Sequence, residues 1–538
     1  MKKIIKPVII TLLILAAGTA ALIYFLMSGS KETGEFDERR YNEQSDQTDS
    51  HIFRSDMASL ATELATEGDN KNVLTFDNSN AFSVSHSKAA RERLDRLIRR
   101  SDPTIENPII ALNPYGTMPW CYYFYFKTPS PCMIRYIITV EDEKIADHIR
   151  YVNNGEVKNI TDTHEFVIGG LIPGRKNFIQ IELIDSNGSH RNEVTYQVDV
   201  PGAMLPDVIP HERGHSDLRL QNGIFFTMPK NDRQIYIYDN NGVMRGVVAT
   251  ESAHGTRLFV NDGSAVYQVS HTKVIRVDRM GQITGAASIH GYGDILDFAY
   301  DGFENVIALV KKGKRYYLAR SSMQGGKTTE VYKFDKGMDV TSIAGVSEGR
   351  LYVSLSSPAG LMRIKGLVSK SPQPDLVIGI KNEWKKTSVK KKVYDPTQVK
   401  KSDAATGAAA KEPQKDAPLT GWDMGDTVLN LIVDESGKAS DVLTFSVVKD
   451  RLVHAVRLRI ASGKKIKDTS VTTELDKETE DSGRVLVEWG DRGSCIIANC
   501  NKGMFEERDE EFKVTRQFKL DRELEGVVKR SLQGFCFY

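Results

Sequence analysis

The chain has 538 residues, which allows several domains at about 100–200 residues each. Its 72 basic and 71 acidic residues nearly cancel, and this balance argues against nucleic-acid binding as the main function. Charged residues make up 27% and hydrophobic residues 40% of the chain, so its composition is that of an ordinary folded protein.

The N-terminus has the pattern of a membrane anchor. Three lysines among the first six residues precede an uncharged run from Pro7 to Met27. At about 1.5 Å per residue, such a run crosses a hydrocarbon core of roughly 30 Å, with the lysines on the cytoplasmic side. The pattern predicts a cytoplasmic tail over 1–6 and a transmembrane anchor over 7–27. The rest of this single-pass cell-membrane protein would be extracytoplasmic. A cleaved signal peptide is the alternative, although its apolar region usually has only about 7–15 residues.

Residues 28–105 are expected to form a stalk with short helices, because the segment begins with a polar stretch that has few aromatic residues. The sequence MASLATELATEG, at 57–68, fits a short helix. A longer helix is predicted by apolar residues at helical spacing ahead of an Asp-Pro stop, namely Ala90, Leu94, Leu97 and Ile98.

Residues 106–201 alternate short aromatic and β-branched runs with turn sequences. The runs include CYYFYFKT, MIRYIITVEDEK, HEFVIGGLIPG, NFIQIELIDSNG and EVTYQVDVP, and the turns include TPSP, NNG and IPG. Such alternation predicts an antiparallel β-sandwich.

Residues 210–538 repeat a unit of strand, polar turn with Gly or Asp, and strand, as in RQIYIYDNNGVMRGVVA and HTKVIRVDRMGQITGAAS. Recurrence at roughly 40–60 residues suggests a β-propeller, here of six blades, and a large array of sandwiches is the alternative. A basic, Ala/Pro-rich segment near 385–420 is expected to be an exposed insertion between blades. The predicted fold class is therefore all-β: a transmembrane helix, a small antiparallel sandwich and a six-bladed propeller.

Five cysteines bear on the compartment: Cys121, Cys132, Cys495, Cys500 and Cys536. In an oxidising compartment they allow two disulfides and one free thiol, and buried thiols are the other interpretation. No segment has the ligand spacing of a zinc or calcium site, so neither a metal nor another cofactor is expected.

Several segments resemble the bacterial arylsulfate sulfotransferases. NPYGTMPW, HEFVIGGLIPG and ELIDSNG are similar to segments of that family's N-terminal β-sandwich, and the blade-like repeats fall where the family continues into a six-bladed propeller. The likeness covers about residues 105–538. It implies transfer of a sulfuryl group from a phenolic sulfate to a phenol, through a histidine that is transiently sulfated. It also implies cationic or hydrogen-bonding groups around the sulfuryl oxygens.

The residues that this resemblance assigns to catalysis are missing from the corresponding places. The segment Gly421–Gly437, in the region of the family's nucleophilic histidine, contains no histidine, and such a loss should remove most of the rate enhancement. Other places hold different residues where the family has a histidine pair, a histidine, an asparagine and an arginine: Tyr292, Gly293, Asp339, Thr341, and Ser356 or Ser357.

Three propeller histidines remain as catalytic candidates: His254 at the start of a blade, His290 ahead of Asp294, and His454 on an alternating strand. Each also fits a structural role, as a turn residue for the first two and a sheet-surface residue for the third.

Two functions stay open. The chain is either a membrane-anchored, extracytoplasmic homologue with a degraded site, or an active or rearranged arylsulfate sulfotransferase that uses a propeller histidine. As a pseudoenzyme it would bind a small anion such as a phenolic sulfate, a glycan or an envelope protein. The histidine-free segment favours this pseudoenzyme interpretation.

Overall fold

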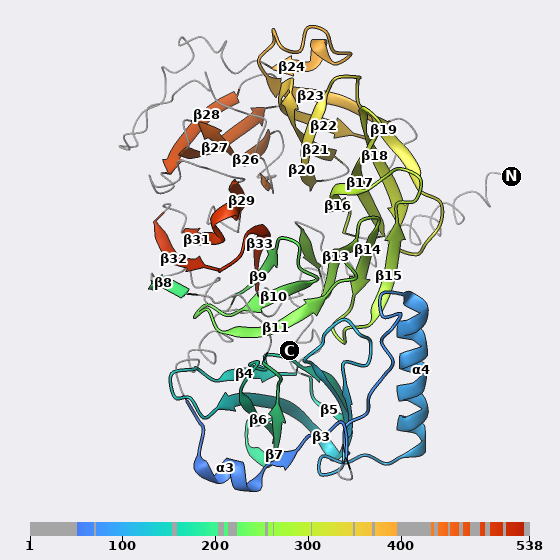
Figure 1. Cartoon of the computed structure of the whole chain (residues 1–538), viewed down its shortest axis with the longest axis vertical. Coiled ribbons are helices and arrows are strands. Elements are labelled where there is room, and N and C mark those ends of the chain that lie inside the picture. Colours follow the sequence, from blue (N-terminus) through green and yellow to red (C-terminus); the bar gives the residue numbers. More distant parts are fainter. Residues whose placement is uncertain are drawn as a thin grey trace, which may run out of the picture. The chain divides into compact units, whose positions relative to one another are not determined.

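The structure is a computed structural model that describes residues 51–394 with short gaps. Beyond residue 431 it describes a series of strands and turns up to residue 531, again with gaps (Figure 1). The predicted anchor over 7–27 lies outside the described residues. Within the described ranges, no helix is long and apolar enough to span a membrane. The transmembrane helix in the predicted fold class therefore stays a prediction without structural support.

The segment ahead of the sandwich begins with α3 (Ser55–Leu60) and β1 (Thr62–Glu63). The helix is shorter than the one predicted over 57–68, because the chain turns into an extended strand that pairs in parallel with β7 (His190–Asp199).

The second helix, α4 (Val84–Arg100), matches the helix predicted from apolar spacing. Ser83 caps it by accepting a hydrogen bond from the backbone N–H of His86 at 3.1 Å. Ala90 and Leu94 are buried in a core that also contains side chains of the sandwich and of the first two ring sheets.

The sandwich is built around one long strand, β3 (Tyr122–Val140), which belongs to both layers. One layer adds β2 (Ile109–Leu112) and β5 (Thr161–Ile168), and the other adds β4 (His148–Tyr151), β6 (Lys176–Ile184) and β7. The register of β3 against β5 shifts between Lys127 and Cys132. The TPSP sequence lies at this shift, so it does not form the predicted turn between two strands but joins two halves of one strand.

Aromatic side chains fill the sandwich core. Phe124 and Phe166 stack with ring centroids 5.8 Å apart, and Phe126 meets Phe166 edge-on at 6.0 Å. Because side chains on a strand alternate between faces, these residues of β3 and β5 share the buried face. The predicted antiparallel sandwich over this region is thus present.

Small sheets of four or five strands follow and form a β-propeller-like ring (Figure 1). The first blade contains β9 (Gly223–Pro229), β10 (Gln234–Tyr238), β11 (Met244–Ala249) and β33 (Leu524–Ser531). The second blade contains β12 (Leu258–Asn261), β13 (Ser264–Ser270), β14 (Lys273–Val277) and β15 (Ile283–Ser288). The third blade contains β16 (Ile295–Tyr300), β17 (Asn305–Lys312), β18 (Arg315–Ser322) and β19 (Thr329–Lys333).

The fourth blade contains β20 (Asp339–Ser347), β21 (Arg350–Ser357), β22 (Ala359–Lys365), β23 (Gln373–Gly379) and β24 (Val393–Tyr394). A further sheet contains β25 (Ile432–Asp434), β26 (Ser440–Lys449), β27 (Leu452–Ala461) and β28 (Ile466–Thr473). The last blade contains β29 (Val485–Trp489), β30 (Cys495–Asn499), β31 (Met504–Arg508), β32 (Val514–Lys519) and β8 (Ile209–Arg213).

The blade number differs from the prediction. Five blades have described side chains, whereas the sheet of β25–β28 is described only by its backbone pairing. Five blades of the ring are therefore established. A sixth is not, because many residues between the fourth and last blades lie outside the described ranges. A six-bladed propeller stays a prediction.

Both ends of the ring region take part in its closure. The C-terminal strand β33 pairs antiparallel with β9 in the first blade, and β8 pairs with β32 in the last. Each of these blades thus contains a strand from the opposite end of the region, which joins the ends by backbone hydrogen bonds.

The described cysteines are Cys121, Cys132, Cys495 and Cys500, and all four are buried free thiols. For these four, the buried-thiol interpretation is confirmed over local disulfides. Cys536 lies outside the described residues, as does the predicted insertion beyond residue 394.

Candidate functional site

A polar cluster of Lys311, Tyr316, Asp339 and Ser356, here called the rim cluster, lies where the third and fourth blades meet. The Tyr316 hydroxyl donates a hydrogen bond to Asp339 Oδ1. Ser356 Oγ donates to Asp339 Oδ2 at 2.9 Å, and Lys311 Nζ donates to the Tyr316 hydroxyl at 2.9 Å. Two of the four, Asp339 and Ser356, hold places where the sulfotransferase resemblance expects a histidine and an arginine.

Local strand pairing explains why these side chains meet. Lys311 and Tyr316 are directly opposite each other in the hairpin of β17 and β18. Asp339 is the first residue of β20, and it pairs with Ser357 near the end of β21. Strand ends at one rim of neighbouring blades therefore bring the four polar side chains together.

The rim cluster combines one carboxylate, that of Asp339, with one ammonium group, that of Lys311. The hydrogen bond from Tyr316 lowers the pKa of Asp339, and the hydrogen bond from Ser356 and the charge of Lys311 act in the same direction against partial desolvation. Asp339 is therefore a carboxylate at neutral pH. By itself this carboxylate would repel a sulfate oxygen about 4 Å away by roughly 1–4 kcal/mol, depending on the local dielectric constant, and the ammonium group of Lys311 offsets part of that repulsion.

Gly293 occupies one of the two positions at which the sulfotransferase resemblance expects a histidine pair. Its φ is +97°, and a Cβ atom added there would lie 2.9 Å from the carbonyl oxygen of Lys311. A side chain at this position would be strained both by the backbone conformation and by the close approach. Its neighbour Tyr292 lies under Lys312, whose Nζ is 5.9 Å from the ring centroid. The histidine pair that the resemblance implies cannot be accommodated here without moving the backbone.

A cavity of about 490 Å³ opens beside the rim cluster. Its lining includes Ser356 and Ser357, two acidic residues and two basic residues, namely Asp335, Glu383, Lys336 and Lys386. The cavity therefore has hydroxyl donors and both signs of charge, and no single sign dominates.

A buried ion pair between Arg257 and Asp297 joins the second and third blades, and backbone groups of Ile343 join it to the fourth. Arg257, directly before β12, donates to both carboxylate oxygens of Asp297 in β16, with Nη2 to Oδ2 at 2.8 Å. Their side chains are only 6% and 3% exposed. Arg257 also donates to the carbonyl of Ile343, whose N–H donates to Asp297 Oδ2 at 2.6 Å. Nε and Nη2 of this guanidinium are thus used to join blades.

Of the three candidate histidines, the structure describes the side chain of His290. His290 lies exposed in the turn between β15 and β16. His454 is in β27 opposite Val447 and Thr472, and its side chain lies outside the description. His254 also lies outside the described residues.

Sequence reasoning missed Lys311 and Tyr316. Their signal was the tight β17–β18 hairpin KKGKRYY, whose pairing sets the two side chains face to face. The bond between Asp339 and Ser356 could not be read from sequence, because it depends on how β20 and β21 pair.

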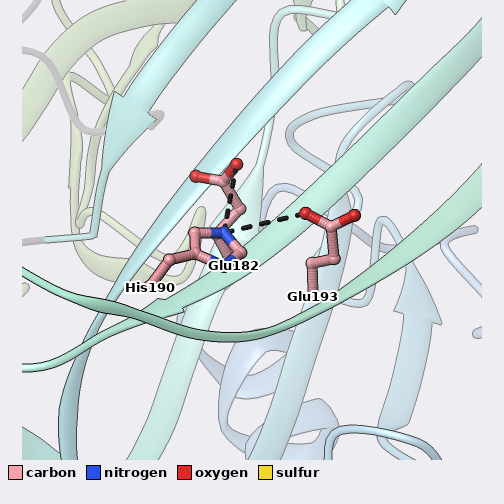
Figure 2. Close-up of side chains that lie close together, drawn as sticks. All are labelled: Glu182, His190 and Glu193. Atoms are coloured by element: carbon pink, nitrogen blue, oxygen red, sulfur yellow. Dashed lines mark ion pairs between the residues drawn. The ribbon is translucent and has the colours of Figure 1, made fainter. Parts of the chain in front are cut away.

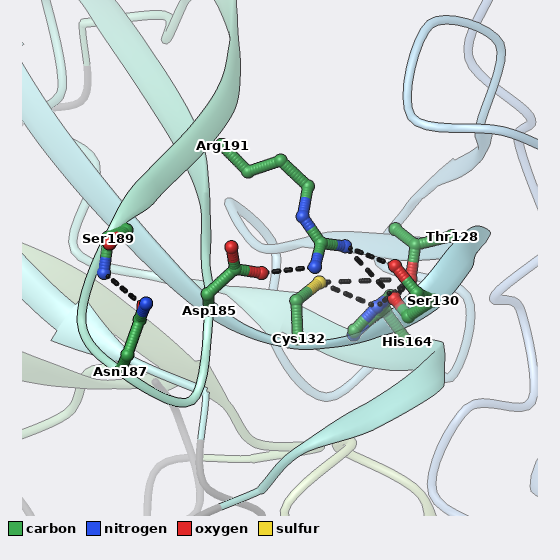
Figure 3. A network of polar contacts seen from close by, with 8 residues as sticks. All are labelled: Thr128, Ser130, Cys132, His164, Asp185, Asn187, Ser189 and Arg191. Atoms are coloured by element: carbon green, nitrogen blue, oxygen red, sulfur yellow. Dashed lines mark hydrogen bonds and ion pairs between the residues drawn. The ribbon is translucent and has the colours of Figure 1, made fainter.

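Two further polar clusters lie in the sandwich. In the first, His190 Nε2 is 3.4 Å from Glu182 Oε1 and 3.7 Å from Glu193 Oε2 (Figure 2). In the second, His164 Nε2 lies 3.6 Å from Cys132 Sγ and 3.0 Å from Thr128 Oγ1 (Figure 3).

The Cys132–His164 pair does not have the electrostatics of a catalytic thiol. Burial raises the pKa of Cys132 and lowers the pKa of His164 to about 4. Both groups are therefore neutral at pH 7, whereas a nucleophilic cysteine needs its thiolate form. Arg191, which completes the network in Figure 3, pairs instead with Asp185 and with Ser130. This network is structural.

Comparison with known proteins identifies the sandwich. Residues 109–201 match the family described as the arylsulfotransferase Ig-like domain. This match covers the segments that carry the sulfotransferase resemblance in the sandwich, and it supports that relationship for this domain. No curated protein sequence matches the chain.

Solved structures give a more distant likeness. A streptogramin B lyase is 12% identical, with 60% of this chain and 97% of that chain covered and a TM-score of 0.32. TolB from Acinetobacter baumannii is 8% identical, with 66% and 79% covered and a TM-score of 0.34. An auxiliary nutrient binding protein from Bacteroides ovatus is 9% identical, with 76% and 95% covered and a TM-score of 0.31. Values this low say nothing of what the chain binds or does.

Proposed function

We propose that this chain is an arylsulfotransferase-like protein whose transfer site is degraded and now serves as a binding site. The observation that carries the proposal is the rim cluster. Asp339 takes the place of a histidine, and Ser356 or its neighbour Ser357 takes that of an arginine. Asp339 accepts hydrogen bonds from both Tyr316 and Ser356. A carboxylate with a lowered pKa at this place is unsuited to stabilising the negative charge that develops during sulfuryl transfer.

Two further observations support the same proposal. Gly293, which holds one of the places of the expected histidine pair, has no room for a side chain without a movement of the backbone. The segment Gly421–Gly437 contains no histidine in any register. Without a nucleophile to carry the sulfuryl group, the two-step transfer has no covalent intermediate.

The ligand of this site is expected to bind in the cavity beside Ser356. Because the two acidic and two basic residues of the lining leave no excess of positive charge, a phenolic sulfate or other small anion is the weaker candidate ligand. Hydroxyl groups and balanced charges in the lining suit a hydroxylated ligand such as a glycan, or a polar loop of an envelope protein. This proposal includes single-pass anchoring by residues 7–27 and an extracytoplasmic location, which rest on the sequence pattern.

The decisive experiment is transfer from 4-nitrophenyl sulfate to a phenol by the purified full chain. We expect release of 4-nitrophenol at the rate of the protein-free control. Clear turnover that is abolished by H254A, H290A or H454A would instead establish the alternative, an active sulfotransferase with a rearranged site. In that case the rim cluster is not the transfer site, and the binding proposal fails with it.

A further inference from the structure

A second candidate site lies on the sandwich, away from the ring and from the proposed ligand site. Among the described residues, Glu182, His190 and Glu193 form a group of metal-ligating side chains whose ligand atoms all lie within 4.8 Å of one another (Figure 2). The spacing of these three residues matches no metal-binding sequence pattern, so the group was not predicted from the sequence.

A β-bulge places the three side chains on one face. Glu182 in β6 is directly opposite Glu193 in β7, and Ile184 is opposite His190, with the register shifting in between. In a regular strand, residues three apart point to opposite faces. The extra residue at Arg191 turns His190 onto the face of Glu193, which is how bulges re-aim side chains next to functional sites.

The spacing of the ligand atoms suits a tetrahedral cation. With metal–ligand bonds of about 2.0–2.2 Å, two ligand atoms of a tetrahedral site are roughly 3.3–3.6 Å apart. His190 Nε2 lies 3.4 Å from Glu182 Oε1 and 3.7 Å from Glu193 Oε2. An ion could therefore enter without a large movement of any of the three side chains.

Surrounding groups orient the carboxylates, as supporting residues do in metal sites. Arg135 pairs with Glu182 Oε2, which leaves Oε1 facing His190. Gln180 Nε2 donates to Glu193 Oε2 at 2.7 Å. Two carboxylates against one guanidinium leave this face with a net negative charge, which attracts a cation.

An unsatisfied buried atom points to a ligand at the same place. Gln180 is 4% exposed, and its Oε1 has no hydrogen-bond partner among the described residues. An amide can exchange its oxygen and nitrogen by a half-turn about its last bond. That half-turn would give up the hydrogen bond from Nε2 to Glu193 and direct the oxygen to the cluster, where a bound cation would hold both Glu193 and this oxygen.

We propose that Glu182, His190 and Glu193 bind a divalent cation of the Zn²⁺ class on the face of the sandwich that points away from its core. One imidazole with two carboxylates suits Zn²⁺ better than Mg²⁺, which prefers an octahedral shell of oxygens. His190 and Glu193 are 43% and 44% exposed and Glu182 is 6% exposed. The ion is thus fixed on its inner side and open on its outer side, where water or a side chain of a partner completes its coordination.

Isothermal titration of the full chain with ZnCl₂, and separately with MgCl₂, tests this site. We expect one Zn²⁺ per chain and no Mg²⁺ binding. The variants H190A and E193Q should each weaken Zn²⁺ binding by at least about tenfold. Both residues are largely exposed, so these variants should retain the fold, which thermal unfolding checks.

The matched control is H271A. His271 is 58% exposed and its Nδ1 lies 3.8 Å from Asp294 Oδ2, and among the described residues this pair belongs to no group of three metal-ligating side chains. Its variant should bind Zn²⁺ as the parent chain does. No binding by the parent chain, or binding of equal strength by H190A, would show that the three side chains form only a surface ion pair. Neither outcome depends on whether the ring transfers sulfuryl groups.

Discussion

The sandwich and the ring use buried polar groups in different ways. In the sandwich, the side chain of Asn177 makes three hydrogen bonds to backbone groups of the nearby turn at Ile172 and Arg175. In the ring, Asp297 bonds Arg257 from one blade and the backbone of Ile343 from another. One polar residue fixes a local turn, and the other joins separate sheets.

This difference shows which structural features the polar residues determine in each region. The sandwich has a continuous aromatic core, so its polar residues shape loops such as GLIPG, which also carry the family match. The blades pack as separate sheets, and charged pairs between their first strands add specific links. The rim of the ring has no such constraint, because Asp339 and Ser356 lie at exposed strand ends.

Breaking the link between blades should have the largest effect. Asp297→Ala leaves the guanidinium of Arg257 buried without its carboxylate, which should lower the free energy of unfolding by about 3–5 kcal/mol. Urea unfolding measures this change. The control Asp294→Ala removes a carboxylate that is 67% exposed and should cost at most about 0.5 kcal/mol.

A double variant tests how much the buried ion pair itself contributes to the stability of the ring. Replacing both partners, as Arg257→Met with Asp297→Leu, should be less destabilising than Asp297→Ala, because no buried charge is left unpaired. If the double variant had the lower free energy of unfolding of the two, the ion pair would stabilise the ring by more than keeping each buried charge paired.

Replacing Asn177, which fixes a local turn, should lower the free energy of unfolding by less than Asp297→Ala does. Asn177→Ala leaves the N–H and C=O of Ile172 without the side-chain partners that lie at 2.8 and 2.9 Å. The expected cost is about 1–3 kcal/mol, measured by urea unfolding beside Asn187→Ala. Asn187 accepts one hydrogen bond in an exposed turn, and its loss should cost at most about 0.5 kcal/mol. Equal costs would mean that the buried turn is not held by its asparagine.

The contact between the two regions should depend on pH. Asp278 precedes the turn that meets the sandwich at Thr117, where Thr117 Oγ1 donates to the carbonyl of Gly281 at 2.6 Å. Burial raises the pKa of Asp278 to about 6, although backbone N–H groups of Gln282 and Met280 donate to it. The folded state therefore binds this proton more tightly than the unfolded chain, whose Asp titrates at about 3.9.

Because the pKa of Asp278 is higher in the folded state, the folded state becomes less stable as the pH rises. The stabilising contribution of protonated Asp278 is fully present below pH of about 4, and it is lost as the pH rises through 6. Thermal unfolding at several pH values should show this loss, at most about 3 kcal/mol, in the parent chain. Asp278→Asn keeps an acceptor for the turn but cannot titrate, so its stability should not fall over this interval. A parallel fall in both proteins would assign the effect to other groups.

The sequence predicted the regular parts of this fold well. The aromatic runs of the sandwich and the spacing of α4 predict their elements because each is a local pattern. The count of six blades was not established, since only five have described side chains. In the candidate site, Asp339 and Ser356 were singled out by resemblance, whereas Lys311 and Tyr316 depend on pairing across a hairpin that a linear pattern does not show.

The smallest expected effect tests the rim itself. Tyr316→Phe removes the hydrogen bond that is the main cause of the lowered pKa of Asp339, so this pKa should rise towards its ordinary value. Carboxylate titration by NMR measures the change. The stability cost should be about 1 kcal/mol or less, because the cluster is open to water and Asp339 keeps its bond from Ser356.

Tyr317→Phe is the matched control, since successive residues of β18 point to opposite faces and, of these two tyrosines, it is Tyr316 that donates to Asp339. This variant should leave the pKa of Asp339 unchanged. A loss of several kcal/mol in Tyr316→Phe would contradict the comparison, because it would make the rim cluster a structural link like that of Arg257 and Asp297. A small loss together with a raised pKa is what a site that is free to bind a ligand requires.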